Sequence, residues 1–404
     1  MRHSPVSTWR RARRLAAALI LGQAAALAQA DEGGAIQVNG FINAGLARSS
    51  FDDARYKYIP TADADIGTAA TPRVDTQAGL QLRYVHSDSL NATAQVLLRD
   101  PPSDGSPLKL TWAYAGIQLT PQIEVKLGRY MMPFFLFTDT RNVRYAQPWV
   151  RPPGEVYALV TNTEFFDGAY LRHLTPLGPW SLATEAFVGA NRYETLRASL
   201  SGTYYGMAFT LYDSNWTFRV MAQNGTTQLE SPAFDRVLAL LQQRAPDVAA
   251  DYAFAESSNT GYLSAGLRYE TEDWLLLAEV AETRPGDSRL LASDTGAYLT
   301  VGRRFGDWMP FVGYAARRSH NTEADARITD PLASATVANV LAQQNYSQRT
   351  VSVGLRWDLV LNLALKLQLD RVQPSNGAKG SFTVPLPAGQ THSDVFSLAA
   401  HYIF

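Results

Sequence analysis

The feature of this sequence that most constrains its fold is an alternation of apolar and polar residues with a period of two. In residues 90–99, alanine, leucine and valine occupy every even position, whereas the odd positions are mostly polar. This pattern is typical of a β-strand with one apolar face. We count about sixteen such segments, each of about 8 to 13 residues, after residue 35. The sequence therefore predicts an all-β protein.

The connections between these segments alternate in length along the chain. The short ones, such as 87–89, 213–215 and 306–307, contain the Asp, Asn, Ser or Gly residues that tight turns require. The long ones contain from about 10 to about 35 residues. If neighbouring strands are antiparallel, all long connections lie at one end of the sheet. With an even strand number, this asymmetry predicts a transmembrane antiparallel up-and-down β-barrel of about 16 strands, with long external loops and short periplasmic turns.

Residues 1–30 have the composition of a cleaved secretory signal peptide. A basic stretch that contains Arg10 and Arg14 precedes an apolar stretch at 15–27, and Ala28-Gln29-Ala30 supplies a cleavage site of small residues. The alternative is an N-terminal membrane anchor, but the apolar stretch is shorter than the ~20 residues that a spanning helix needs. We therefore predict that residues 31–404 form the mature barrel.

Composition excludes several classes of protein. The chain has no cysteine, which excludes disulfides, thiolate catalysis and cysteine-based metal sites. The net charge is −1 and no basic block occurs, so nucleic acid is not an expected partner. No later apolar run approaches the length of a membrane-spanning helix. No His or carboxylate spacing matches a metal-ligand motif, and we expect no cofactor.

One long connection differs from the others in composition. After a strand at 123–129 the alternation stops for about 35 residues. Prolines at 133, 148, 152 and 153 exclude a central strand or an uninterrupted helix there. This segment, at about 130–167, is nevertheless rich in aromatic residues and arginine, for which a disordered surface loop has little use. We predict that it folds into the barrel and forms a constriction.

Another long connection carries a helix signal. Ser231 followed by Pro232 is typical of an N-cap and a first helical residue. Val237 and Leu241 then fall on one helical face before Pro246 interrupts the pattern. We predict a short helix at the mouth of the barrel.

Two stretches resemble the Gram-negative outer-membrane porins. The chain ends in Phe404, with Phe396 and Tyr402 at alternate positions before it, as in the terminal strand of outer-membrane barrels. The stretch from Lys126 to Pro133 is similar to the Leu-Gly-Arg plus nearby proline pattern that opens the third external loop of those porins. The architecture of the whole mature chain resembles that of the family, whereas the residues themselves resemble it only in these two stretches.

The resemblance implies a location, an assembly route and partners. It implies a barrel in the bacterial outer membrane, surrounded by lipid and lipopolysaccharide, and a homotrimer. It also implies that the barrel-assembly machinery reads Phe396, Tyr402 and Phe404 as an assembly signal. In many porins the third loop narrows the pore and sets acidic groups opposite a basic ladder on the wall. This sequence departs from that pattern, because its third loop carries arginines beside its acids.

Extending the alternation assigns a set of mostly cationic residues to the inner wall. A basic lumen of this kind predicts a weak preference for anions. The alternatives are that each arginine pairs with an acid, and that the prolines only anchor the loop to the wall. Gln95, Glu185 and Asp370 are assigned inward as well. The residues predicted to line the lumen or the constriction are Arg83, Lys126, Arg129, Asp139, Arg141, Arg144, Arg151, Glu155, Arg219, Arg268, Arg304, Arg356 and Lys366.

These features together predict a porin and not an enzyme. Such a protein forms a water-filled channel for passive diffusion of small hydrophilic solutes or ions, narrowed here by the third external loop. One alternative is a plugged structural or adhesive barrel, in which the lumenal charges neutralise one another. The other alternative is an outer-membrane hydrolase. Only Ser319-His320-Asn321 suggests a Ser/His arrangement, and adjacency in sequence does not give a spatial triad.

Overall fold

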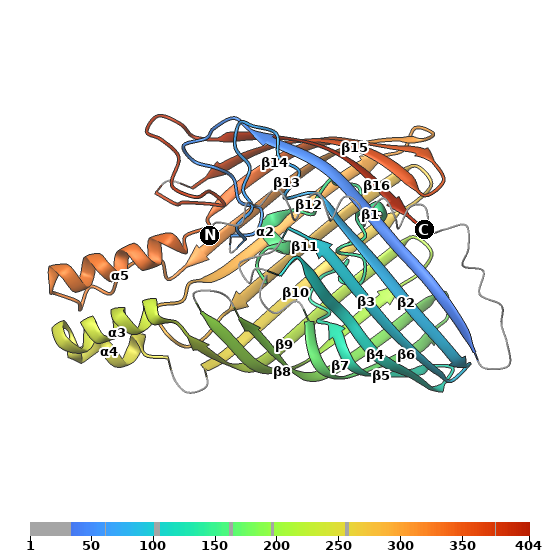
Figure 1. Ribbon diagram of the computed structural model, residues 1–404, viewed down its shortest axis with the longest axis horizontal. Helices are drawn as coiled ribbons and strands as arrows, with labels where there is room; N and C mark the ends of the chain where they lie inside the picture. The colour runs from blue at the N-terminus through green and yellow to red at the C-terminus, as the bar shows by residue number, and fades with distance from the viewer. Residues whose placement is uncertain are drawn as a thin grey trace, which may run out of the picture.

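The computed structural model describes residues 34–60, 62–100, 106–160, 165–194, 198–254, 258–375 and 377–404. Within these ranges sixteen strands form one closed antiparallel barrel (Figure 1). Each strand pairs with its neighbours in sequence, and β1 pairs with β16 to close the sheet. The predicted fold class and strand number are therefore confirmed. The predicted signal peptide, residues 1–30, lies outside the described residues.

The strands have similar lengths, as expected for the wall of a barrel. In the first half of the chain they are β1 (Ala35–Ser49), β2 (Gln77–Ser87), β3 (Leu90–Arg99), β4 (Leu108–Thr120), β5 (Ile123–Met131), β6 (Phe165–Leu177), β7 (Trp180–Glu194) and β8 (Ser199–Tyr212). In the second half they are β9 (Trp216–Glu230), β10 (Ser258–Glu270), β11 (Trp274–Arg284), β12 (Ser293–Arg303), β13 (Trp308–His320), β14 (Gln348–Val360), β15 (Leu363–Pro374) and β16 (Ser393–Ile403).

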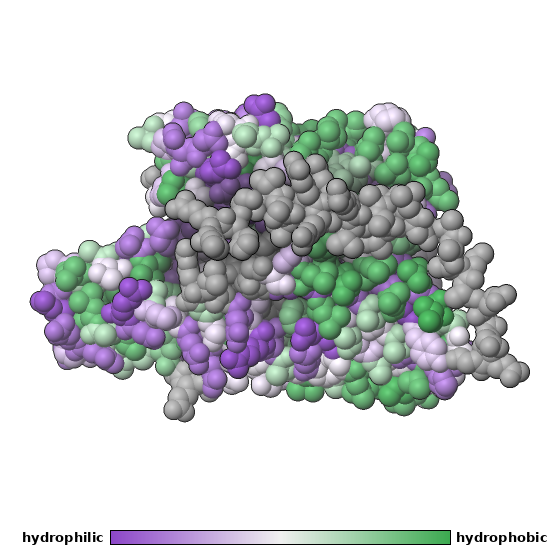
Figure 2. Space-filling model, in the orientation of Figure 1, coloured by the Kyte–Doolittle hydropathy of each residue, from purple (hydrophilic) through white to green (hydrophobic). Residues whose placement is uncertain are grey.

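The barrel presents its apolar residues outward. Figure 2 shows hydrophobic residues gathered on the barrel wall away from the helices, and hydrophilic residues near the helices and long loops. A wall that is apolar outside and polar inside suits a lipid environment. Large apolar side chains that are exposed on the outer face include Leu46, Leu82, Leu127, Leu171, Val188, Val220, Leu263, Val280, Leu299, Val312, Val353, Leu367 and Leu398.

Several strands extend further toward the external end than the alternation predicts. β9 reaches Glu230, whereas the apolar pattern ends at residue 224. Its last outward residues, such as Asn224 and Thr226, are polar and exposed. The strand therefore continues beyond the apolar band, where outward side chains no longer need to be apolar, and the period-two signal disappears.

The long loops carry the helices. The loop between β9 and β10 contains α3 (Pro232–Arg244) and α4 (Pro246–Tyr252), which confirms the predicted helix and its interruption at Pro246. The loop between β13 and β14 contains α5 (Pro331–Gln343), which the sequence analysis missed although Asp330 caps it through the Ala333 amide. These three helices project from one end of the barrel (Figure 1). Among the described residues, no helix has the length and apolar character needed to cross a membrane.

Candidate functional site inside the barrel

The third external loop, L3, connects β5 and β6 and folds into the barrel. It spans residues 132–164 and is described as far as residue 160. It is slightly shorter than the predicted segment 130–167, because β5 continues through Met131 and β6 begins at Phe165. L3 contains two short helical turns, η2 (Arg144–Ala146) and α2 (Gly154–Tyr157). Its interior position makes it the candidate functional element.

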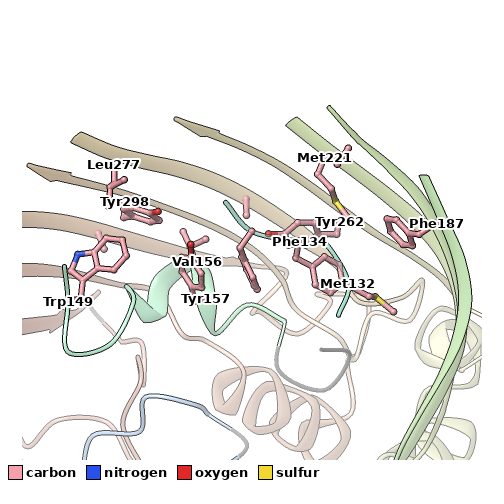
Figure 3. Close-up of a cluster of buried hydrophobic side chains, with 14 of the residues drawn as sticks. Met132, Phe134, Trp149, Val156, Tyr157, Phe187, Met221, Tyr262, Leu277 and Tyr298 are labelled. Carbon is pink, nitrogen blue, oxygen red and sulfur yellow. The ribbon is translucent and has the colours of Figure 1, made fainter. Parts of the chain in front are cut away.

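One side of L3 packs on the inner wall through aromatic rings. Phe134, Phe135 and Tyr157 are at most 2% exposed. The ring of Phe134 lies 4.7 Å from that of Tyr262 on β10 (Figure 3). Phe135 stacks on Tyr157 with centroids 4.5 Å apart. The same buried cluster takes in wall residues from β6 to β13. Burial of these rings, each of which removes a large apolar area from water, holds L3 against this half of the barrel.

The opposite side of L3 is bound through its backbone. Lys366 on β15 donates hydrogen bonds to the carbonyl oxygens of Arg144 (2.6 Å), Gln147 (2.6 Å) and Trp149 (3.0 Å). Arg356 on β14 donates to the Gln147 carbonyl as well (3.1 Å). Buried carbonyls in an irregular loop have no ladder partner and need donors from elsewhere. These two predicted lumen cations face inward, but Lys366 serves to bind L3 and is only 1% exposed.

A buried carboxylate fixes the arginines of L3. Asp75 lies in the first external loop, L1 (residues 50–76), and is completely buried. Its oxygens lie 3.3 Å from Arg144 Nη1 and 2.6 Å from Arg151 Nη1. Arg151 also lies 3.6 Å from Asp370 on β15. Asp75 is not among the predicted site residues, because no local signal in the sequence indicates a partner about 70 residues away.

The prediction that Arg141, Arg144 and Arg151 line a water-filled opening is wrong. These residues are only 8%, 6% and 2% exposed. Arg141 donates to the Tyr157 carbonyl (2.9 Å) and lies over the Phe135 ring, 5.1 Å from its centroid. A sequence pattern cannot distinguish a loop side chain that faces water from one that faces the wall. The alternative, in which these arginines pair with acids and L3 is anchored, agrees with the geometry.

Glu155 is also an anchor and does not face open water. It is 3% exposed and accepts hydrogen bonds from Gln348 Nε2 (2.7 Å) and Thr350 Oγ1 on β14. Burial raises the pKa of its carboxyl, and the two hydrogen bonds oppose that shift. Gly296 on β12 permits the close approach of α2, because a Cβ there would lie 2.0 Å from the Glu155 carbonyl oxygen. A side chain at position 296 would therefore displace L3.

Lys126 lies among tyrosine rings where L3 leaves the wall. Its Nζ is 4.5 Å from the ring centroid of Tyr130, 5.2 Å from that of Tyr170 and 5.3 Å from that of Tyr114. The Tyr130 hydroxyl donates to Asp139 of L3 (2.9 Å). Aromatic faces attract an ammonium group within about 6 Å. Lys126 and Asp139 are thus brought near one another through Tyr130.

The other predicted wall cations face inward, and most of them are paired. Each lies an odd number of positions along the chain from an exposed apolar residue of its own strand or, for Arg304, of the strand β12 that ends just before it, as Arg219 does from Val220. Lys126 lies 3.7 Å from Glu124. Of the additional inward assignments, Gln95 is buried and accepts a hydrogen bond from Thr111. The remaining pairs are Arg219 with Glu185 (2.5 Å), Arg268 and Arg304 with Glu270, and Arg356 with Asp358 (2.7 Å).

Arg83 and Arg129 lie on opposite faces of the wall. Arg83 on β2 faces inward, between the outward Leu82 and Tyr84, and is exposed. Arg129 shares the outward parity of Leu127, pairs with Asp167 at 2.7 Å and lies over the Phe165 ring at 4.4 Å. The prediction that Arg129 lines the lumen is therefore wrong. The prediction departed from the alternation at the last residue of the expected strand at 123–129, whereas β5 continues to Met131 and its alternation carries the Arg129 side chain outward.

The three residues of the proposed assembly signal lie at the closure of the barrel. Phe396 is 48% exposed on the outer face. The rings of Tyr402 and Phe404 stack with centroids 6.1 Å apart. Phe404 exchanges backbone hydrogen bonds of 2.9 and 3.0 Å with Gly40 on β1. The terminal residue thus joins the last strand to the first.

The only Ser/His pair singled out in the sequence does not form a catalytic arrangement. Ser319 Oγ donates to Asp294 (2.6 Å), whereas His320 Nε2 lies 3.1 Å from Thr295 Oγ1. As neighbours on β13, the two side chains point to opposite faces of the wall. Within the described part of the chain, no group of His, Asp or Glu residues could hold a metal ion.

Solved structures with the same fold are outer-membrane proteins. OmpF of Salmonella typhi in complex with daunomycin is 11% identical, with a TM-score of 0.56 over 93% of this chain and 99% of that one. The anion-selective porin from Comamonas acidovorans is 12% identical, with a TM-score of 0.54 over 92% and 100%. The trimer form of OmpT, an outer membrane protein of Vibrio cholerae, is 11% identical, with a TM-score of 0.51 over 92% and 100%.

No protein-family model and no curated protein sequence matches this chain. The likeness is therefore one of fold, carried by the closed barrel and its strand number. The chain has the fold of the bacterial outer-membrane porins.

Proposed function

We propose that this protein is an outer-membrane porin, through which small hydrophilic solutes and ions diffuse passively, and that L3 narrows the channel. The observation that carries the proposal is the attachment of L3 to two sides of the inner wall. Aromatic packing binds it to β6–β13, and Lys366 with Arg356 binds it to β14 and β15. A 16-stranded barrel contains an aqueous channel unless something fills it. A loop fixed in this way reduces that channel to a defined opening.

The opening that remains is bounded by β2–β6 and by the edge of L3 that carries Asp139. Arg83 faces inward from β2 and is exposed, and Lys126 and Arg172 face inward from β5 and β6 and are partly exposed. An inward-facing cation that stays exposed borders water in the lumen. Solutes therefore pass this wall rather than the wall of β11–β16, where the inner face is largely buried beneath L3.

A weak preference for anions follows from the charges along this passage. Arg83, Lys126 and Arg172 supply three cations, against the carboxylates of Glu124 and Asp139. Charge lining a water-filled constriction biases which ions pass. Because other wall cations are paired with Glu185, Glu270 or Asp358, the excess is modest.

Location and partners belong to the same proposal. The apolar outer face suits outer-membrane lipid with lipopolysaccharide, and the position of Phe404 suits recognition by the barrel-assembly machinery. The trimer form of a structure with this fold supports a homotrimer. We do not propose a hydrolase, because Ser319 and His320 bind different partners and do not form a catalytic pair.

A plugged structural barrel is the second candidate, and one observation favours it. L1 also folds inward, where Tyr56 and Tyr58 are 5% and 7% exposed, and it shares the buried charges of L3 through Asp75. If L1 and L3 together close the lumen, the protein conducts no ions.

Planar-bilayer recording of the purified protein tests the two candidates. A porin gives stable open-channel steps, and a salt gradient gives a reversal potential of the sign expected for a small anion preference. A folded barrel that stays silent at all voltages would reject the channel and favour the plugged barrel. Heat-modifiable migration in gel electrophoresis establishes that the preparation is folded before it is recorded.

A further inference from the structure

A row of arginines lies on the outer face of the barrel, at the external ends of β13, β14, β15 and β1. Each arginine is exposed and lies within the four outermost residues at that end of its strand. In a barrel that crosses the outer membrane, the hydrocarbon gives way to lipid head groups near the strand ends. This row, the arginine rim, consists of Arg48, Arg318, Arg349 and Arg371.

The strand register brings the members of the rim close together. Arg349 lies opposite the residue two before Arg318 on β13, and opposite the residue two beyond Arg371 on β15. Diagonal neighbours of this kind lie about 7–8 Å apart. Arg48 on β1 lies opposite Phe396 of β16, and its guanidinium carbon is 6.0 Å from the centroid of that ring. The rim is therefore one basic strip and not a set of isolated charges.

The rim carries little compensating negative charge. Arg371 pairs with Asp394 on β16 at 2.9 Å, whereas the other three arginines have no ion pair within the described part of the chain. Outward arginines at the external ends of other strands each have an acidic partner. These pairs are Arg129 with Asp167 (2.7 Å), Arg192 with Glu194 (2.8 Å) and Arg284 with Glu282 (3.5 Å). Unpaired positive charge on the outer face is thus concentrated in one sector of the wall.

An apolar groove adjoins the rim on the side of the membrane centre. Its volume is about 500 Å³, and β1, β14, β15 and β16 line it, with Arg48 at its external end. This volume lies within the range of about 300–1,000 Å³ that is typical of sites for small organic ligands. Its large apolar lining residues are Leu46, Val353, Leu355, Leu367, Leu369, Phe396 and Leu398.

We propose that the arginine rim and this groove bind a phosphorylated, acylated lipid of the external leaflet, which in the outer membrane is lipopolysaccharide. The inference deepens the lipid partner of the proposed function and rests on its outer-membrane location, but not on conduction. A guanidinium group presents paired donors that match phosphate oxygens. Basic clusters at a membrane surface recognise phosphorylated head groups in the same way. The groove beside the rim takes an acyl chain of the same molecule, which buries apolar surface on both sides.

A second copy of the chain fits this sector less well than a lipid does. Covering the rim with protein would remove unpaired guanidinium groups from water, and a buried charge without a partner is costly. The acids beside the other outward arginines are already paired and supply no counter-charge. A lipid phosphate brings the missing negative charge to the level where the rim lies.

Native mass spectrometry of the purified full-length chain in detergent tests the inference. The probe is phosphorylated lipid A, the membrane anchor of lipopolysaccharide, and the reference is dephosphorylated lipid A. We expect saturable binding of the probe, weakened at least tenfold in the double variant Arg48→Gln with Arg349→Gln. The matched control is Arg192→Gln with Arg284→Gln, which removes two paired outward arginines and leaves the affinity unchanged.

A further variant tests the groove. Leu367→Trp fills part of the groove and leaves the rim arginines in place. We expect weaker binding of phosphorylated lipid A, because the acyl chain loses its place against the wall. Unchanged affinity in this variant would overturn the position of the acyl chain.

Three results would overturn the site as a whole. They are no saturable binding of phosphorylated lipid A, equal affinity in the folded rim variant and the control variant, and loss of oligomers in the lipid-free rim variant. The last result would assign the sector to a second copy. If the rim variant does not fold, the wild type decides through the two lipids, and equal affinity for both would reject the rim.

Bilayer recording keeps this inference separate from the proposed channel. Lipid binding by a barrel that conducts no ions removes the channel and keeps the lipid site. Conductance without lipid binding removes the lipid site and keeps the channel.

Discussion

The ammonium group of Lys366 lies 2.6 Å from the carbonyl oxygen of Gln147, and this contact joins the wall of the barrel to the middle of L3. The two residues are 219 positions apart in the sequence. The strand periodicity correctly assigns Lys366 to the inner face, yet its partner is a backbone atom of a distant loop. Lys366 was expected to attract ions in the lumen, whereas this contact holds L3 against the wall.

Lys366→Met should loosen L3. The change removes three hydrogen bonds and leaves the carbonyls of Arg144, Gln147 and Trp149 without that donor. A hydrogen bond to a charged group contributes about 1.5–3 kcal/mol. We expect larger and noisier single-channel conductance and faster proteolysis within L3. Lys379→Met is the control, since Lys379 lies over the Tyr346 ring in another external loop. Identical conductance and proteolysis in both variants would contradict this role.

Asp75→Asn should destabilise the folded barrel. The substitution leaves Arg144 and Arg151 buried without the carboxylate that they share. Breaking a buried ion pair by removing one partner typically costs about 3–5 kcal/mol. The midpoint of thermal unfolding in detergent measures the effect. Glu194→Gln, in an exposed pair with Arg192, should leave that midpoint nearly unchanged. Equal midpoints for the two variants would show that the buried pair contributes little.

The wall of the barrel was predictable because each strand carries its own signal. Alternation within β3 or β5 needs only neighbouring residues, and the parity of Lys126 or Arg219 follows from it. The wrong assignment of Arg129 departed from the period at the last residue of the expected strand, whereas β5 keeps its alternation through Met131.

The interior of the barrel was predictable only in part. The prolines and aromatic residues of the segment at 130–167 predicted an inward fold, which the structure shows for residues 132–160. What each side chain contacts did not, since Arg151 meets Asp75 and Glu155 meets Gln348 across long separations in sequence. Residues in an irregular loop have no period from which a direction can be inferred. The structure therefore differs from the prediction at loop residues such as Arg151 and Glu155. For these residues, contacts with distant parts of the chain determine whether the side chain faces water or the wall.

Gly296→Val should displace L3 without touching a charged residue. A Cβ at this position would lie 2.0 Å from the Glu155 carbonyl oxygen, closer than any ordinary contact. We expect an altered single-channel conductance with the barrel still folded. Gly261→Val is the matched control in β10, where the nearest atom to a Cβ lies at 3.6 Å. If both variants conduct as the wild type does, α2 is not part of the narrowing.

Deletion of Phe404 should impair assembly in the outer membrane. The residue closes the barrel through two backbone hydrogen bonds to Gly40, and a Cβ on Gly40 would lie 2.4 Å from its ring. The measurement is the fraction of heat-modifiable protein in outer-membrane preparations, compared with Phe305→Ala, which removes an exposed ring near a periplasmic turn. Normal insertion of the deletion variant would reject the assembly signal.

Arg83→Gln and Arg129→Gln form a matched pair that tests the passage. Both remove one arginine from a strand, but Arg83 faces the lumen and is exposed, whereas Arg129 faces outward and pairs with Asp167. Removing a lumenal cation lowers the positive potential that favours anions. The reversal potential under a salt gradient should therefore shift toward cation preference in Arg83→Gln and stay at the wild-type value in Arg129→Gln. Equal shifts in the two variants would mean that the effect is one of net charge and not of the passage. An unchanged reversal potential in both variants would mean that solutes do not pass along β2. The passage would then lie beside a wall whose cations are already neutralised by Glu185 or Glu270.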